Sequence, residues 1–599
     1  MLFERVGSNP TPGTKLKNFK MRTKLIEKKP KEKIIEEKTK DKVLKIVPLG
    51  GLEEVGRNMT YFEYGDDIII VDMGLGFPEA ETMPGVDFVV PNIESLKNKK
   101  EKIRGIFITH GHYDHIGAIP YLIEQIGNPP IYATPLSRGI ILRRQEDFPY
   151  APKLEIYEFN KKEYKKINVG AFEVEWFHVN HNIPDSVGFV IRTPVGNILH
   201  TGDFKIDFTP MCDLPADLTR IVELSKDITL LMADSTNADQ PGHVISEREI
   251  MKNLEEIFKE APRRIFASTF ASLIERIQQL IWLSEKYNRK VVIDGYTMKM
   301  NTEVAKALGY LKVERFTLIS PEEALKLDPS RVTVICTGAQ GEDNSVLMRI
   351  ASGDHKYFKI QPQDTVIFSS SVVPGNERSV QMLKDSLYRQ GARVFHYQMM
   401  DIHASGHAFR EDLKLLISIV KPKYFMPIHG HYFMLKQAGE IAKSLGYSDD
   451  QIIIASNGQV IEMDERGVRL SDKKEPAGYV FVDGLGVGDV GEVVLRDRQV
   501  MSQDGIFVIV VVIDSQTGRL RTSPDIISRG FVYLRESQEL LKEVRALIKK
   551  IVAKSVNQNT PWPLINEDFI KNNIKEELGE FLFKKTHRRP MLIPVIIQV

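Results

Sequence analysis

The chain has 599 residues and a mass of 68.2 kDa, which is too long for one hydrophobic core and predicts about three or four domains. Its 81 Lys and Arg residues balance 80 Asp and Glu residues, so any surface that binds nucleic acid must be a local patch. The two cysteines, Cys212 and Cys336, exclude a disulfide framework and a thiolate metal cage. The longest apolar run, 506–513, is far shorter than the roughly 20 residues that cross a bilayer, and the N-terminus lacks an apolar signal core. We therefore expect a cytoplasmic protein without membrane segments.

Residues 1–41 differ from the rest of the chain in composition. Residues 1–40 hold 12 Lys and Arg against 5 Asp and Glu, with few periodic apolar positions. This composition predicts a disordered basic arm. Two interpretations stay open: a tail that tethers RNA, and a solvated extension with no fixed role.

From Val43 to about residue 240 the chain is rich in short strands. Apolar runs predict strands at 68–74 and 103–109. Apolar residues at helical spacing over 115–127 then predict a helix, with a glycine at its end.

The pattern changes at about Ser246, where predicted helices begin to alternate with apolar strands. This alternation is typical of a parallel sheet with covering helices. The earlier pattern resumes after His407, which predicts that the helix–strand segment is inserted into the first domain. A Gly-rich connector at 484–491 leads to a small α+β domain at the C-terminus.

The densest group of metal-binding residue types directly follows the strand at 103–109. His110, His112, Asp114 and His115 lie within six residues at a predicted strand-to-helix turn. Neutral imidazole and carboxylate suit zinc, or manganese where more oxygen ligands join. Because the first two residues and the last two lie on different arms of the turn, one segment can supply ligands to two neighbouring ions.

Further candidate ligands stand at the ends of other predicted strands. They are Asp72, His181, Asp203 and His429, each beside a Gly or Pro turn. Any one of them alone could be a turn former or a surface residue. Together they predict one side of a sheet sandwich that carries a dinuclear centre.

Several motifs together resemble a known family. The stretches LGGLEEVGRN, ITHGHYDHIGAI, HNIPDSVG and HTGDFK are similar to the metallo-β-lactamase fold. ADSTNA, FASLIERIQQ, DIHASGHA and KPKYFMPIHG narrow the resemblance to the β-CASP branch of nucleic-acid processing enzymes, and most closely to the bacterial ribonuclease J family. The similarity covers residues 43–599. It implies an α/β fold, with a metallo-β-lactamase αββα sandwich, an inserted β-CASP α/β domain and a small C-terminal α+β domain.

The resemblance also divides the chain into domains. The metallo-β-lactamase domain is expected in two parts, 42–246 and 410–485, with the β-CASP domain between them at 247–409. A linker at 486–502 would lead to a C-terminal domain at 503–599. The resemblance assigns this last domain to the assembly of a homodimer or homotetramer, and it suggests partners in RNA degradation or on the ribosome.

Carried over residue by residue, the resemblance implies two zinc ions per chain, with manganese or magnesium as alternative working metals. One ion would be held by His110, His112 and His181, and the other by Asp114, His115 and His429. Asp203 would bridge the two ions, and Asp72 would orient the histidines. Two cations about 3.5–4 Å apart can activate water, polarise a phosphodiester and stabilise charge on the departing 3′-oxygen.

The β-CASP motifs imply roles for further residues. Asp234 and His407 match the groups expected to transfer protons to the leaving oxygen. The loop formed by His403, Ala404, Ser405, Gly406 and His407 would bind a substrate phosphate and select a 5′-monophosphate end, although HASGH alone is also the pattern of an ordinary N-capped helix. A second stretch expected to contact RNA consists of Ser272, Leu273 and Ile274. The resemblance further implies one structural calcium ion near Asp87 and Asp483, which also fit ordinary turn acids.

We therefore expect a metal-dependent ribonuclease that degrades RNA 5′-to-3′ from a 5′-monophosphate end and can also cut internally, in rRNA processing, RNA maturation and mRNA decay. One rival is a metallohydrolase of small molecules, such as a lactonase or thioesterase, but such an enzyme has no need for the inserted domain with HASGH. The other rival is a metal-depleted RNA-binding scaffold, against which the intact set of ligand positions speaks.

Overall fold

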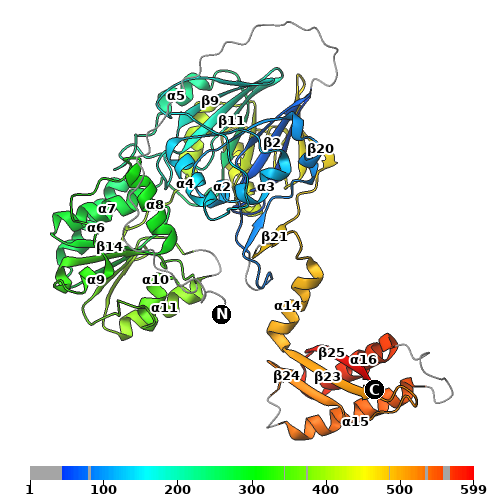
Figure 1. Ribbon diagram of the computed structural model, residues 1–599. Helices are drawn as coiled ribbons and strands as arrows, with labels where there is room; N and C mark the ends of the chain where they lie inside the picture. The colour runs from blue at the N-terminus through cyan, green and yellow to red at the C-terminus, as the bar shows by residue number, and fades with distance from the viewer. Residues whose placement is uncertain are drawn as a thin grey trace. The chain divides into compact units, whose positions relative to one another are not determined.

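The computed structural model of the protein describes residues 43–78, 82–342, 345–372, 376–484, 486–532, 537–556 and 567–599 (Figure 1). The expected basic arm, residues 1–41, lies outside the described residues. Within the described part of the chain, the helices are all too short or too polar to cross a membrane.

Two sheets packed face to face form the first domain. From edge to edge the larger sheet consists of β20 (Gly467–Lys474), β19 (Gln459–Asp464), β1 (Leu44–Gly50), β2 (Met59–Tyr64), β3 (Asp67–Val71), β5 (Ile103–Phe107), β6 (Ile131–Ala133) and β7 (Ile156–Glu158). The smaller sheet consists of β18 (Tyr424–Ile428), β12 (Ile228–Asp234), β11 (Gly196–His200), β10 (Val187–Thr193), β9 (Phe172–His178) and β8 (Ile167–Val169). Phe62, Phe107 and Phe189 lie in the shared apolar core between them. Burial of such alternating apolar faces holds the two sheets together.

Helices cover both outer faces of this sandwich. The larger sheet carries α1 (Glu94–Lys97), α2 (Tyr113–Ile116), α3 (Ile119–Leu122) and α4 (Pro135–Gln145). The smaller sheet carries α5 (Leu218–Leu224), α12 (Arg410–Val420) and α13 (Tyr432–Ser444). These four layers confirm the predicted αββα sandwich.

The single helix predicted over 115–127 was wrong, because the chain there forms α2, α3 and a 3₁₀ turn at Glu124–Ile126. The helix is interrupted at Ala118, whose backbone N–H donates to the carbonyl oxygen of Met73 and not to a carbonyl one turn earlier, while the Met73 N–H donates to the carbonyl oxygen of His115. Pro120 also lacks the N–H that would continue the helical pattern.

The inserted domain has a five-stranded parallel sheet, as the alternating pattern predicts. Its order is β14 (Lys290–Asp294), β15 (Val332–Cys336), β13 (Ile265–Ser268), β16 (Thr365–Phe368) and β17 (Arg393–His396). Ile265 and Ala267 face a core shared with α6 (Glu247–Glu260) and α7 (Ile274–Lys286). Phe266 faces the opposite core, with α10 (Val346–Ser352) and α11 (Glu377–Arg389). Figure 1 shows these helices on both faces of the sheet, with α8 (Tyr296–Ala307) beside β14.

The C-terminal part begins after β21 (Val480–Asp483), which pairs with β4 (Phe88–Val90). The segment at 486–502, expected to be a linker, contains most of helix α14 (Glu492–Asp504). A three-stranded sheet follows, in the order β24 (Asp525–Arg529), β23 (Ile506–Ile513) and β25 (Met591–Gln598). One face of this sheet packs on α15 (Gln538–Ser555) and α16 (Glu567–Thr586), as an α+β domain requires.

Candidate metal centre

Loops at the carboxyl ends of strands from both sheets bring the candidate ligands together. In the larger sheet β3 and β5 run parallel, so Asp72 and the turn that begins at His110 lie at the same edge. In the smaller sheet β11, β12 and β18 run parallel, and Asp203 and His429 follow the first and last of them. Asp72 and His429 both have left-handed backbones, with φ of 62° and 51°, which is strain that clusters at functional sites.

Three imidazoles converge on one point at this edge. His112 Nδ1 lies 3.0 Å from His110 Nε2 and 3.1 Å from His181 Nε2. Ligands of a tetrahedral zinc ion lie roughly 3.3 Å apart when each Zn–N bond is about 2.0–2.1 Å. Burial holds the pKa of His110 and of His181 well below the usual range and lowers that of His112 to about 4. All three rings are therefore neutral near pH 7, which is the form that binds a metal.

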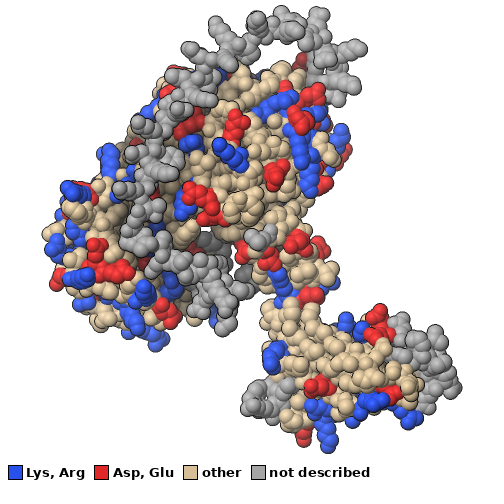
Figure 2. Space-filling model, in the orientation of Figure 1, with Lys and Arg blue, Asp and Glu red and all other residues tan. Residues whose placement is uncertain are grey.

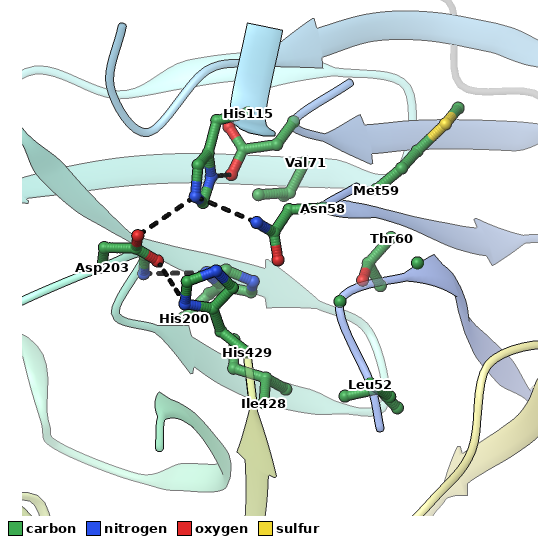
Figure 3. A pocket seen from close by; sticks show the side chains of 14 residues that line it. Leu52, Asn58, Met59, Thr60, Val71, His115, His200, Asp203, Ile428 and His429 are labelled. Carbon is green, nitrogen blue, oxygen red and sulfur yellow. Dashed lines mark hydrogen bonds and ion pairs between the residues drawn. The ribbon is translucent and has the colours of Figure 1, made fainter. Parts of the chain in front are cut away.

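A second group of ligands lies beside the first. His115 Nε2 is 3.5 Å from Asp114 Oδ2 and 3.2 Å from Asp203 Oδ2, while His429 Nε2 is 3.4 Å from Asp114 Oδ2. Figure 3 shows Asp203 between His115 and His429. Burial opposes protonation of these two histidines, but the surrounding carboxylates outweigh it, and Asp203 is the strongest of them. The pKa of His115 is raised well above its usual value, and that of His429 is raised to about 10.

The arrangement fits two divalent cations. Asp203 Oδ2 lies 3.8 Å from His110 Nε2 and 3.8 Å from His181 Nε2, and it is closer still to His115, so one carboxylate reaches both groups. His429 Nε2 is buried and has no hydrogen-bond partner within the described ranges. An ion in the second group would give this nitrogen, whose contact with Asp114 Oδ2 is an ion pair at 3.4 Å, a direct partner.

Asp72 holds the histidine turn from behind. Its Oδ2 lies 2.8 Å from His115 Nδ1, and its two oxygens accept hydrogen bonds from the backbone N–H and the hydroxyl of Thr109. The carboxylate therefore fixes the tautomer of His115 that leaves Nε2 free for a metal. This contact places Asp72 outside both ligand groups and next to one of their members.

Asp234 and His407 form a hydrogen-bonded pair at the rim of the centre, with 2.8 Å between Asp234 Oδ2 and His407 Nδ1. The ring of His407 lies 5.0 Å from that of His181 and 5.4 Å from that of His429, measured between centroids. Asp203, Asp234, His407 and His429 also lie close enough together to form a third group of possible metal ligands. The pair therefore borders the space in which a substrate would meet the metal ions.

The loop at 403–407 abuts the first ligand group. The carbonyl oxygen of Gly406 accepts a hydrogen bond from His181 Nδ1 at 2.6 Å, which orients that ring. Ser405 Oγ accepts hydrogen bonds from Asn237 Nδ2 and from the backbone N–H of His407. Ala404 is buried, whereas Ser405 and His407 are half-buried and accessible from outside. Burial, with repulsion from Arg276 second, lowers the pKa of His403 to about 3.

Other predicted site residues lie in less suitable surroundings. The side chains of Leu273 and Ile274 are fully buried and cannot contact RNA. Within this stretch only the half-buried Ser272 or the backbone could form such a contact. Asp483 forms an ion pair with Arg498, and Asp87 Oδ2 accepts the backbone N–H of Gly484. These carboxylates have protein partners, and the calcium site stays a prediction.

Sequence reasoning missed a buried charge network that joins the sandwich to the inserted domain. Glu247 binds Lys205 at 3.1 Å and Arg276 at 2.7 Å, and all three side chains are buried. Arg276 also donates to the carbonyl oxygen of Ile402 at 2.7 Å, directly before the 403–407 loop. The network therefore ties the Asp203 turn to this loop. The available signal was that Lys205 in HTGDFK and Arg276 in FASLIER are charged residues within motifs and had been assigned no role.

His200 was missed as well. Its Nδ1 accepts the backbone N–H of Gly202 at 3.0 Å, and burial lowers its pKa to about 4. With Asn58, Thr60 and Asp72 it lines a small pocket of about 20 Å³, which the candidate ligands His115, Asp203 and His429 also line (Figure 3). This volume suits one water molecule, for which Asn58, Thr60 and Asp72 offer polar partners among the apolar side chains.

Comparisons with known proteins agree with the geometry. Residues 52–240 match the metallo-beta-lactamase superfamily, 262–387 the Ribonuclease J beta-CASP domain, 396–448 the Zn-dependent metallo-hydrolase RNA specificity domain, and 493–599 the Ribonuclease J C-terminal domain. Ribonuclease J 1 of Streptococcus pyogenes is 39% identical over 92% of this chain and 97% of its own. Ribonuclease J of Thermus thermophilus is 39% identical over 93% of this chain and 95% of its own.

A solved structure shares the fold alone. It is a protein of unknown function from Enterococcus faecalis V583, with a TM-score of 0.52 and 19% identity, and it covers 70% of this chain and 100% of its own.

Proposed function

Because the chain belongs to the ribonuclease J family and is therefore a metal-dependent ribonuclease, we propose that it removes nucleotides 5′-to-3′ from RNA with a 5′-monophosphate end and also cuts internally. Such an activity serves rRNA processing, RNA maturation and mRNA decay. The observation that supports this proposal most directly is the contact between the 403–407 loop and His181 of the first ligand group. A substrate phosphate on this loop would lie next to the metal centre.

The proposed ligand sets are those that the geometry brings together. His110, His112 and His181 would hold one zinc ion, and Asp114, His115 and His429 the other, with Asp203 between them. When bound, the two ions supply activation of water and stabilisation of charge on the phosphate. Manganese or magnesium, which prefer oxygen ligands, would suit the second set with its Asp114 and Asp203 carboxylates better than the three imidazoles of the first.

In this proposal the chain's own residues bind the substrate and move a proton. Asp234 keeps the Nδ1 proton of His407 in place, so Nε2 is the ring nitrogen that can exchange a proton with the leaving 3′-oxygen. The hydroxyl of Ser405 and the backbone of the loop before α12 would hold the phosphate.

A time course with two matched RNAs tests the proposal. The RNAs have the same sequence and an internal label on every nucleotide, and they carry either a 5′-monophosphate or a 5′-hydroxyl. We expect mononucleotides from the monophosphate RNA from the first time point and a much slower release from the hydroxyl RNA. Equal rates on both ends, with fragments of intermediate size, would contradict the polarity. Hydrolysis of lactone or thioester substrates without RNA cleavage would favour the small-molecule rival.

We also propose that a second copy of the chain covers one face of the C-terminal sheet. The face opposite α15 and α16 exposes Ile593, Val595 and Ile597, which are 37–44% accessible. They pair in register with Val508, Val510 and Val512 of β23, so the apolar side chains are contiguous. Figure 2 shows a broad tan area on this domain, with charged side chains toward its margins. An apolar face of this kind is typical of an interface.

Light scattering on the wild type and on Val595→Lys tests the assembly. The wild type is expected to be a dimer or tetramer and the variant a smaller species with an unchanged circular dichroism spectrum. A wild-type monomer at micromolar concentration would contradict the proposal.

The free thiols of Cys212 and Cys336 fit a reducing compartment, and we assign the protein to the cytoplasm.

A further inference from the structure

Three consecutive aromatic side chains, at 431–433, are exposed and are separated from the buried His429 only by Gly430. Tyr432 is 54% and Phe433 is 53% accessible, and His431 before them is exposed too. Single exposed apolar residues are ordinary on a protein surface, but three consecutive aromatic rings beside a metal centre are not. We call His431, Tyr432 and Phe433 the aromatic step.

The backbone fixes the aromatic step at the rim of the centre. His429 directly follows β18 and has a left-handed backbone, and α13 begins at Tyr432. Gly430 forms bridges with Leu52 and Glu54, so the loop at 52–54 holds the turn from the other side. Figure 3 shows Leu52 near Ile428 and His429.

Helix periodicity keeps these rings out of the core. Leu435, Ala438 and Ile441 form the buried face of α13, so the first residues of the helix point outward. The rings of His431 and Phe433 lie nearly parallel, with 8° between their planes and 6.3 Å between their centroids. They therefore present flat faces in the same orientation.

The aromatic step and the 403–407 loop adjoin different ligand groups. Gly406 contacts His181 of the first group, whereas the aromatic step continues from His429 of the second. A strand whose 5′-phosphate lies on the 403–407 loop would pass the metal ions and meet the aromatic step with its following nucleotides.

We propose that the aromatic step stacks bases of single-stranded RNA on the 3′ side of the scissile phosphate. This inference rests on the proposed function, because it takes its polarity from the phosphate loop. Stacking suits an enzyme that degrades many sequences, since every base has a flat face whereas hydrogen-bond readout would select among bases. Because the aromatic step lies next to the nuclease centre, we expect it to bind the single-stranded RNA substrate.

The test compares the wild type with the double variant Tyr432→Ala/Phe433→Ala. Loss of stacking is expected to raise KM about 10-fold for a long unstructured 5′-phosphorylated RNA. The kcat and the bound metal are expected to stay unchanged, because neither Tyr432 nor Phe433 belongs to a ligand group. Tyr388→Ala is the matched control, since Tyr388 is an equally exposed aromatic residue on α11.

Abasic RNA locates the contact. RNA without bases just 3′ of the cleaved bond should bind the wild type as weakly as intact RNA binds the variant, and the variant should lose nothing further. Affinity for labelled RNA in the presence of chelator provides a readout that does not depend on hydrolysis. If the wild type cleaves no RNA, the proposed function fails. The RNA affinity of the wild type compared with that of the variant still shows whether the aromatic step binds RNA. Unchanged RNA affinity in the variant, with or without an altered oligomeric state, would overturn the inference.

Discussion

His407 Nδ1 donates a hydrogen bond to Asp234 Oδ2 at 2.8 Å, at the carboxyl end of β12 and beside both metal-ligand groups. The other oxygen of Asp234 accepts hydrogen bonds from the backbone N–H and the hydroxyl of Thr236, so the carboxylate cannot turn. Burial opposes protonation of His407, but attraction to Asp234 outweighs it and raises the pKa of this histidine. The pair is thus built to hold an imidazole in one orientation with its proton on Nδ1.

Asp234→Asn and His407→Ala are expected to lower kcat for RNA by about 10²- to 10⁴-fold, the usual contribution of a positioned acid or base. Asn in place of Asp234 retains the shape but no longer favours the productive tautomer. The measurement is single-turnover hydrolysis together with the metal content of each variant. A loss of activity that only follows a loss of metal would show that the pair binds ions and does not move protons.

Gly406→Ala should weaken the first ligand group. A Cβ at this position would lie 2.7 Å from His181 Cε1 and 2.6 Å from Asn182 Nδ2, so the ring of His181 must shift. Such a shift is expected to reduce zinc affinity at least 10-fold, as loss of outer-shell support does. Gly478→Ala is the control, because a Cβ there meets nothing within 4 Å. Equal zinc affinity in both variants, measured by competition with a chelating dye, would refute this coupling.

Metal binding should release protons at neutral pH. The raised pKa values of His115 and His429 mean that both rings carry a proton before an ion arrives, and the ion must displace it. Zinc affinity is therefore expected to rise with pH across the neutral range. Calorimetry in buffers with different ionisation enthalpies should give about two protons released per chain. A heat of binding that is independent of the buffer would be inconsistent with this charge state.

Glu275 should make stability depend on pH. Burial, with repulsion from Glu247 second, raises the pKa of Glu275 to about 7 from 4.5. Between these values the unfolded chain loses the proton first, so the contribution of this residue to stability falls as pH rises and is fully lost above pH 7. The size of the loss is about 3 kcal/mol.

Glu275→Gln tests this because Gln can still accept the backbone N–H groups of Met211 and Cys212. Thermal denaturation should show the variant more stable than the wild type at pH 8, with a clearly smaller difference at pH 5. If the stability difference between variant and wild type is the same at pH 5 and pH 8, Glu275 is not the source of the pH dependence.

The sequence could predict elements and residue types but not long-range pairings. Apolar runs located the parallel strands of the inserted domain because a strand buried on both faces must be apolar throughout. The prediction of one helix over 115–127 was wrong because Met73, from a distant segment, forms backbone hydrogen bonds with His115 and Ala118. No local pattern could show this competition.

The same limit applies to the site. Imidazoles and carboxylates at strand ends indicated a metal centre, since that chemistry needs those residue types at one edge. The network of Lys205, Glu247 and Arg276 stayed hidden because its members come from three separate segments with no shared spacing. Leu273 and Ile274 could be placed in a motif, but only the packing shows that their side chains are buried.

The most direct test of a dinuclear ribonuclease is to count metal ions and hydrolysis on the same sample. Protein stripped by a chelator is titrated with zinc, and bound zinc per chain and cleavage of 5′-labelled RNA are measured at each step. We expect no cleavage in the stripped protein, two ions bound at saturation, and full activity only as the second ion binds. Full RNA hydrolysis by protein shown to hold no metal would contradict it.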